Sequence, residues 1–335
     1  MRSFIIFHAV VALGLAPTCA GAQDELPSGL SGTVVVVNKQ GNDASFIDLE
    51  SGEIVATAPT GTGPHELVVS PDGRLAVATN YGGGSANTLT VFDIASASVV
   101  RTIDLGRFTR PHGIAFMPDG DVVAVTSEST SNVVLVRVSD GQVLANISTE
   151  ASGSHMLGVT GDGSTIWTGD MGSDTVTQLS VADGAKIRSF PAPAQPEAIN
   201  VSPDGSRVFA GSNDTGRVTA FDTANGSSTL VAEGFGWPYR IFLTPGVAQI
   251  IIPDLEHETL RFFDGDDYAE LGRIDFPGEG PEGLILHPDG RHLFLSLARG
   301  NHIAVVDIRT RKVVGYLPAG AGPDGIGYSA VRVTR

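Results

Sequence analysis

Seven similar units of about 42 residues follow one another along this chain, and this repetition limits its fold more than any other feature. Each unit opens with a two-residue anchor, mostly Pro and a polar residue, and continues through a short apolar run to a tight turn. The anchors begin at residues 64, 111, 154, 196, 238, 281 and 323. A period of this length with strand-rich units is typical of a β-propeller, which gathers equivalent positions of all repeats around one axis.

Each unit contains four short strand patterns. In the unit that starts at residue 64, apolar runs cover residues 66–70 and 74–79, residues 88–93 alternate with period two, and residues 99–105 form the fourth run. The whole chain has 42 glycines and 19 prolines, which fits a turn-dense all-β protein and disfavours helices. Aspartates eight residues after an anchor are interpreted as turn residues, since Asp-Gly pairs shape such turns: Asp72, Asp119, Asp162, Asp204 and Asp289.

The two ends of the chain complement each other. Residues 33–38, 44–49 and 53–59 match the second, third and fourth strands of a unit that lacks its innermost strand. Residues 325–333 supply one such strand, so we expect it to complete the N-terminal blade and remove free sheet edges. The predicted fold is therefore an all-β, seven-bladed β-propeller of four-stranded antiparallel blades. Residues 33–335 form this single domain, and residues 23–32 a short N-terminal extension.

Residues 1–22 have the pattern of a secretory signal peptide. Arg2 supplies the positive start, residues 4–16 are apolar but too short to span a bilayer, and Ala20-Gly21-Ala22 is a small-residue cleavage site. We predict cleavage after Ala22 and a periplasmic or secreted protein. A lipoprotein signal that uses Cys19 is the alternative, with Ala16-Pro17-Thr18 as a poor context for it.

Charge and cysteine content narrow the function further. The formal net charge is −16, which argues against nucleic acid and anionic membrane surfaces and favours cationic ligands or basic partner proteins. Cys19 is the single cysteine and lies in the predicted signal, so the mature chain has no disulfide and no thiolate nucleophile. No segment beyond the signal resembles a membrane span. We expect a small molecule or a periplasmic protein as partner, and the sequence leaves the oligomeric state open.

The second anchor residue of each repeat is predicted to point toward the mouth of the central channel. These seven positions are polar: His65, His112, His155, Glu197, Tyr239, Glu282 and Asp324. Sixteen residues after each anchor, the second strand ends and another loop opens on the same face. Tyr81 and Arg240 lie directly beside positions of these two sets. Members of the sets and these two neighbours give the ligand-binding candidates Tyr81, Asp170, Tyr239, Arg240, Asp254, Glu282 and Asp324.

Imidazoles and carboxylates in one ring suit two kinds of chemistry. They can hold a divalent metal such as Zn, Mn or Fe, with His65, His112, His155 and Glu197 as the candidate ligands. They can also act as acid and base, with His155, Glu197 and Arg240 as the catalytic candidates and the arginine suited to a substrate carboxylate or phosphate. The simpler interpretation is a hydrated channel lined by polar side chains without a ligand.

Several repeats are similar to a known family. Residues 36–38 with 45–48, Pro111-His112-Gly113, and Ser202-Pro203-Asp204-Gly205 resemble the YVTN-type seven-bladed β-propeller repeat proteins, over essentially residues 33–333. This resemblance implies the propeller fold and an exported bacterial protein with a binding role. His155, Glu197 and Arg240 on successive repeats are loosely similar to the lactonase-type propellers, and His with Glu to the streptogramin-lyase type. The surrounding motifs of those enzymes are absent, so no catalytic role is transferred.

The sequence therefore favours an exported propeller that binds a small ligand, metal or protein partner at the polar channel face. Two alternatives remain open at this point. One is a metal-assisted hydrolase, lactonase or lyase with its active site at the channel mouth. The other is an interaction scaffold without a small-molecule site. Whether the protein is an enzyme is not decided by the sequence.

Overall fold

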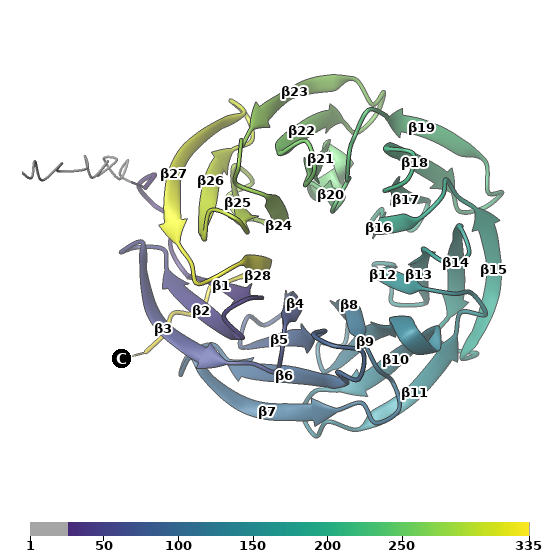
Figure 1. Cartoon of the computed structure of the whole chain (residues 1–335), viewed down its shortest axis with the longest axis horizontal. Coiled ribbons are helices and arrows are strands. Elements are labelled where there is room, and N and C mark those ends of the chain that lie inside the picture. Colours follow the sequence, from purple (N-terminus) through teal and green to yellow (C-terminus); the bar gives the residue numbers. More distant parts are fainter. Residues whose placement is uncertain (1–25, 335) are drawn as a thin grey trace, which may run out of the picture.

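The repeated units form a ring of seven four-stranded antiparallel sheets in the computed structural model, which describes residues 26–334 (Figure 1). The blade that holds both chain ends consists, from inside to outside, of β28 (Pro323–Ser329), β1 (Thr33–Asn38), β2 (Asp43–Asp48) and β3 (Glu53–Pro59). The predicted all-β, seven-bladed architecture is thus confirmed. The predicted signal peptide lies outside the described residues.

The other blades follow in chain order, each from its innermost to its outermost strand. The first of them contains β4 (Pro64–Val69), β5 (Leu75–Asn80), β6 (Thr88–Asp93) and β7 (Ser98–Asp104). The second contains β8 (Pro111–Phe116), β9 (Val122–Ser127), β10 (Asn132–Arg137) and β11 (Val143–Ser148). The third contains β12 (Ser154–Val159), β13 (Thr165–Asp170), β14 (Thr175–Ser180) and β15 (Ala185–Pro191). The fourth contains β16 (Pro196–Val201), β17 (Arg207–Ser212), β18 (Arg217–Asp222) and β19 (Ser228–Ala232). The fifth contains β20 (Phe242–Leu243), β21 (Gln249–Asp254), β22 (Thr259–Asp264) and β23 (Glu270–Asp275). The sixth contains β24 (Pro281–Leu286), β25 (His292–Leu297), β26 (His302–Asp307) and β27 (Lys312–Pro318).

Helix is confined in the described residues to two 3-10 turns, η1 (Glu128–Thr130) and η2 (Pro245–Val247). No helix in residues 26–334 is long and apolar enough to cross a membrane. The second of these turns replaces the Asp-Gly turn in the one repeat that has Gly246 at the aspartate position.

Ring closure uses the C-terminal strand as predicted. β28 pairs antiparallel with β1, with Thr33 opposite Ser329 and Val35 opposite Gly327. The strand begins earlier than predicted and ends at Ser329 instead of residue 333, because β1 starts at Thr33 and offers no partner beyond that point. The following residues leave the ladder, and Val331 and Val333 pack on the apolar cluster of the adjoining blade.

Seven apolar clusters fill the spaces between neighbouring blades. In one of them Leu89 and Val91 of β6 pack against Val123 and Val125 of β9, while Phe92 faces the blade on the other side. Alternate side chains of a strand thus enter two different interfaces, which is why these strands are apolar on both faces. The innermost strands consequently present their free backbone edges to the central channel.

The two faces of the ring differ in their loops. On the turn face, the first and second strands of a blade meet at the Asp-Gly turns, where Gly73, Gly120, Gly163, Gly205 and Gly290 have φ between +66° and +78°. The aspartates accept bonds within the turn, as Asp204 does from Ser202 Oγ at 2.6 Å, so their interpretation as turn residues is confirmed. On the opposite, anchor face, the inner strands begin with the anchors.

Candidate functional site

A β-bulge at the start of the inner strands positions the side chains of the anchor face. In β4, Pro64 is opposite Asn80 and Leu67 is opposite Ala78, so two residues face one residue of the partner strand. Equivalent shifts by one residue occur at the start of β8, β12, β16, β24 and β28. A bulge re-aims the side chains at that point. The second anchor residue and the residue after it therefore both reach the channel, as the 3.7 Å between His65 Nδ1 and Glu66 Oε1 shows.

Three imidazoles from consecutive blades lie in a row at the anchor face. The ring centroids of His65 and His112 are 4.2 Å apart, and those of His112 and His155 are 3.5 Å apart. The central ring of His112 is fully buried, and neither of its nitrogens has a hydrogen-bond partner among the described residues. Burial and the neighbouring His155 lower the pKa of His112 well below its usual value. The neutral imidazole therefore offers one unprotonated nitrogen as a ligand.

Two carboxylates hold His155, on one side of the row. Its Nδ1 lies 3.0 Å from Glu128 Oε2, and its Nε2 lies 3.6 Å from Glu197 Oε1. Burial opposes the charged imidazole, but the hydrogen bonds to Glu128 and Glu197 outweigh it and raise the pKa of His155. Asn213 donates its side-chain amide to Glu197. This histidine is therefore more cation-like than His112 and less suited to bind a metal.

His65, on the other side, contacts a buried carboxylate. Its Nδ1 lies 2.6 Å from Asp324 Oδ2, and Lys39 Nζ lies 3.1 Å from its Nε2. Tyr239 donates its hydroxyl to the same carboxylate at 3.2 Å. Burial raises the pKa of Asp324, but the nearby His65 and Lys39 outweigh this and hold it well below its usual range. An imidazole oriented by a carboxylate is the arrangement found behind many metal-ligating histidines.

Glu282 contrasts with Asp324 on the neighbouring blade. Burial, and then the negative charge of Asp324, raise the pKa of Glu282 to about 9. Its Oε2 has no hydrogen-bond partner among the described residues. At neutral pH the ring thus holds a protonated carboxyl group beside an ionised one, which provides both a hydrogen-bond donor and an acceptor.

A single ion pair crosses the channel between opposite blades. Arg240 donates through Nη2 to Glu66 Oε1, and its Nη1 donates to the carbonyl oxygen of Tyr239 at 2.6 Å. Glu197 Oε1 is 4.0 Å from the same guanidinium. Burial disfavours the charge, yet Glu66 outweighs it and the pKa of Arg240 rises above its usual value. This pair closes the middle of the channel.

Small residues at the same repeat position explain why the channel is narrow there. A Cβ on Gly113 would lie 2.8 Å from backbone atoms of Met156 and Leu157, and Cβ atoms on Gly283 and Gly325 would also meet backbone of the next inner strand. Glu66 and Arg240 occupy this same position in their own repeats. Arg240 directly precedes the shortest inner strand, since β20 begins two residues later and contains two residues.

A second polar group stands above the histidine row, at the mouth. The ring centroid of Tyr81 is 4.8 Å from that of His112, and the Tyr81 hydroxyl donates to Glu128 Oε2 at 2.6 Å. The guanidinium of Arg110 lies 4.2 Å from the centre of the Tyr81 ring and is 3.2 Å from Glu128 Oε1. The predicted ligand-binding candidates Tyr81, Tyr239, Arg240, Glu282 and Asp324 are thus brought together with the histidines.

Asp170 and Asp254, in contrast, lie within single blades. Asp170 is buried and accepts bonds from four hydroxyl groups of its own blade, those of Ser154, Thr168, Thr175 and Thr177. Asp254 accepts the backbone N–H groups of Gly236 and Trp237 and lies 3.0 Å from His257 Nδ1. Asp170 therefore joins β12, β13 and β14 of its own blade, and Asp254 fixes the loop at Gly236 and Trp237.

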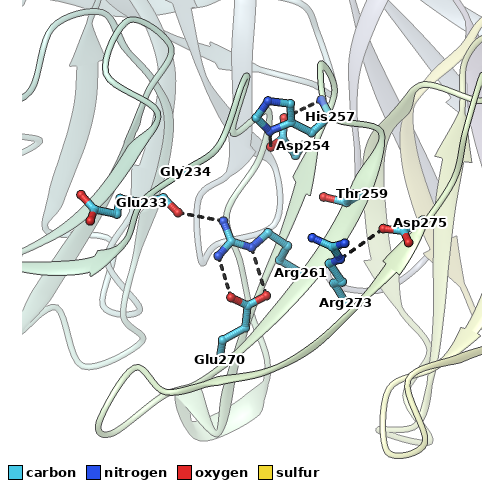
Figure 2. A pocket seen from close by; sticks show the side chains of 9 residues that line it. All are labelled: Glu233, Gly234, Asp254, His257, Thr259, Arg261, Glu270, Arg273 and Asp275. Atoms are coloured by element: carbon cyan, nitrogen blue, oxygen red, sulfur yellow. Dashed lines mark hydrogen bonds and ion pairs between the residues drawn. The ribbon is translucent and has the colours of Figure 1, made fainter.

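Asp254 also borders a separate pocket of about 480 Å³ beside the blade of β20–β23 (Figure 2). Figure 2 shows two of its arginines paired with carboxylates, Arg261 with Glu270 and Arg273 with Asp275. The N–O distances are 2.7 Å and 3.3 Å. Arg261 also lies over the Phe235 ring at 4.2 Å. These mutual contacts account for the pocket's charges without a ligand.

The sequence prediction missed Glu66, and it also missed Lys39 and Arg110, which contact His65 and Tyr81. Together with His65 and His112, Glu66 forms a group in which one ligand atom of each residue lies within 4.8 Å of the others. The predicted ligands His155 and Glu197 lie next to this group but contact each other and Glu128. The signal for Glu66 was present in the repeats, because Glu66 and Arg240 are the two charged residues in a column otherwise made of Gly, Ala and Met.

Comparisons with known proteins support the fold class. Residues 14–122 match the model of the YNCE-like beta-propeller family. Together with the seven-bladed ring, the match confirms the predicted resemblance to seven-bladed propellers of the YVTN type. A search of curated proteins finds no match.

Two solved structures illustrate the same architecture. One is a chain of the Kuenenia stuttgartiensis hydrazine synthase, with a TM-score of 0.72, 18% identity, and coverage of 87% of this chain and 99% of that chain. The other is a functionally unknown protein from Desulfotomaculum acetoxidans DSM 771, with a TM-score of 0.75, 18% identity, and coverage of 89% and 99%. At this identity the likeness shows the fold alone.

Proposed function

We propose that this propeller is an exported binding protein that holds a divalent transition-metal ion at its anchor face. His65, Glu66 and His112 are the proposed ligands, and the ion is of the Zn, Mn or Fe class. Two imidazoles and one carboxylate are a ligand set used by proteins for these metals. The signal pattern of residues 1–22 supports a periplasmic or extracellular location.

One observation carries this proposal. His112 is fully buried, and both of its ring nitrogens lack a hydrogen-bond partner among the described residues, although buried polar groups are nearly always paired. The unsatisfied nitrogens lie beside His65 and Glu66, whose ligand atoms are within 4.8 Å. A cation at this point satisfies an imidazole nitrogen and neutralises part of the buried negative charge of Glu66 and Asp324.

Surrounding residues supply the support that a metal site needs. Asp324 holds His65 through Nδ1, in the way that second carboxylates orient metal-bound histidines, and leaves Nε2 as the ligand atom. Lys39 Nζ lies 3.1 Å from Nε2, so this ammonium group must move aside when the ion binds. Burial in the channel, with Tyr81 covering His112 from the mouth, restricts access of water. The ion itself supplies Lewis acidity, while the chain's own residues orient the ligands and exclude solvent.

The test is metal binding by protein purified without an affinity tag. Chelator-treated protein is titrated with Zn²⁺ and Mn²⁺, and with Fe²⁺ under anaerobic conditions, followed by elemental analysis. We expect one ion per chain, and a loss of affinity of at least about 100-fold in His65→Ala/His112→Ala. His257→Ala is the matched control, because this exposed histidine of the anchor face is 54% exposed and outside the ring. Absence of binding, or equal binding by the double variant, contradicts the proposal.

A further inference from the structure

The Glu66–Arg240 pair divides the channel into two chambers. On the anchor side lie the histidine row and Asp324. On the turn side lies a cavity of about 240 Å³, bordered by Glu66 and Arg240 and by residues of the inner strands such as Leu67, Ile199 and Ile285. Of the described residues that line this cavity, Arg240 carries the one positive charge.

Backbone groups as well as apolar side chains form the walls of this cavity. Leu67, Ile199 and Ile285 direct their side chains into the clusters between blades, and each inner strand is hydrogen-bonded on one edge only. The peptide groups of the free edges therefore border the cavity together with aliphatic carbon. Such walls suit a small molecule with both a polar end and a short apolar part.

Arg240 and a metal ion compete for Glu66 when both bind through Oε1. This oxygen accepts the bond from Arg240 and lies 3.7 Å from His65 Nδ1, within the proposed ligand group. A metal ion that takes Oε1 as its ligand therefore draws the carboxylate away from the guanidinium. Arg240 then keeps Glu197 at 4.0 Å as its nearest carboxylate and remains a buried cation that lacks a close counterion.

We propose that the turn-side cavity binds a small carboxylate on Arg240, and that metal binding to Glu66 opens this site. The metal dependence of this carboxylate site rests on the proposed metal-binding function. A carboxylate is the expected ligand because the planar guanidinium matches its two oxygens. The cavity volume of about 240 Å³ is sufficient for a short-chain acid.

The test uses propionate as the probe and titrates it calorimetrically into chelator-treated and Zn²⁺-loaded wild-type protein. We expect at least tenfold tighter binding to the loaded protein, and an equal gain in Zn²⁺ affinity with propionate present, because coupling is reciprocal. Propylammonium, of the same size and opposite charge, is expected not to bind.

Glu66→Gln tests the cavity without a metal. This variant frees Arg240, so metal-free Glu66→Gln is expected to bind propionate and to show a raised thermal midpoint with it. Adding Arg240→Lys to Glu66→Gln is expected to weaken propionate binding at least tenfold. Adding Arg207→Lys instead is the control, because Arg207 lies on the turn face but outside the cavity lining, and it should leave the affinity unchanged.

The outcomes separate the two proposals. If metal-free Glu66→Gln does not bind propionate, or binds it equally after Arg240→Lys, the carboxylate site is wrong even where Zn²⁺ binds. Equal propionate binding by apo and loaded wild-type protein overturns the coupling. Propionate binding by Glu66→Gln in a protein whose wild type takes up no metal leaves the cavity site standing and removes the proposed metal function.

Discussion

The two faces of this propeller are built from the same repeat, yet they differ in how far the repeats agree. On the turn face, five repeats place an Asp at the same position and a Gly with positive φ directly after it. On the anchor face, the seven equivalent positions hold three His, two Glu, one Tyr and one Asp. The turn face repeats one local structure, whereas the anchor face combines different side chains into one group.

This difference indicates which positions shape the fold and which form the site. A turn needs the same backbone geometry in every blade, so the same residues recur. A channel ring brings each blade's residue next to a different neighbour, so a buried charge such as Arg240 requires one particular partner. Substitutions on the anchor face should therefore have individual and larger effects than those on the turn face.

The largest loss of stability is expected for Arg240→Met. This change leaves the carboxylate of Glu66 buried without its counterion, which costs about 3–5 kcal/mol. Urea denaturation of chelator-treated protein measures the free energy of unfolding. The double variant Glu66→Gln/Arg240→Met should recover most of the loss, since it removes both charges. A cost below about 1 kcal/mol for the single variant would show that the pair does not close the channel.

A smaller loss is expected for Gly113→Ala. The new Cβ meets backbone atoms of β12 at 2.8 Å, and the overpacking costs about 1–3 kcal/mol. Ala198→Gly, at the equivalent repeat position, is the control and should cost below about 1 kcal/mol. Thermal or urea unfolding distinguishes the two. Equal stability of Gly113→Ala and wild type contradicts the close approach of the inner strands.

Glu282→Gln tests the polar ring by its pH dependence. The folded-state pKa of about 9 exceeds the ordinary value of 4.5, so this group's contribution to stability is complete below about pH 4.5 and is lost as pH rises through 9. Between pH 7 and 9.5 the wild type should lose stability more steeply than Glu282→Gln, which mimics the protonated carboxyl. Parallel curves from urea denaturation at each pH would mean that Glu282 is ionised in the folded protein.

The smallest effect is expected on the turn face, for Asp204→Asn. Hydrogen bonds from Ser202 and Ser206 lower the pKa of Asp204 to about 2. Its contribution is therefore present above about pH 3.8 and lost as pH falls through about 2. Because the carboxylate is exposed, we expect the substitution to change the free energy of unfolding by no more than about 1 kcal/mol at pH 7. Below about pH 4 the stability of the variant should depend less on pH than that of the wild type. An effect as large as that of Arg240→Met would remove the contrast between the faces.

The repeat made most of the fold predictable. The blade count, the four strands per blade and the closure by the C-terminal strand follow from anchor spacing and period-two patterns, as β6 and β3 show with their predicted bounds. Strand ends were less predictable where a partner decides them, as at Ser329. Turn aspartates were predictable because their role is local.

The site was only partly predictable, since loop and bulge geometry decide which side chains meet. Alternation along a strand predicts that neighbours point to opposite sides, but the bulge in β4 brings both His65 and Glu66 to the channel. The same alternation misplaced Asp170, whose end-of-strand position is occupied by bonds to four hydroxyl groups of its own blade. The repeats mark Glu66 and Arg240 as two unusual charges at one repeat position, but the repeat period does not show that they pair across the ring.

Anomalous diffraction at the zinc edge from crystals of the Zn²⁺-loaded protein tests the central claim most directly. The account predicts one strong peak at the anchor face, about 2.0–2.1 Å from an imidazole nitrogen of each of His65 and His112, with a Glu66 oxygen as the third protein ligand. A peak at His287 and His292 on the turn face instead, or none in the channel, would contradict it.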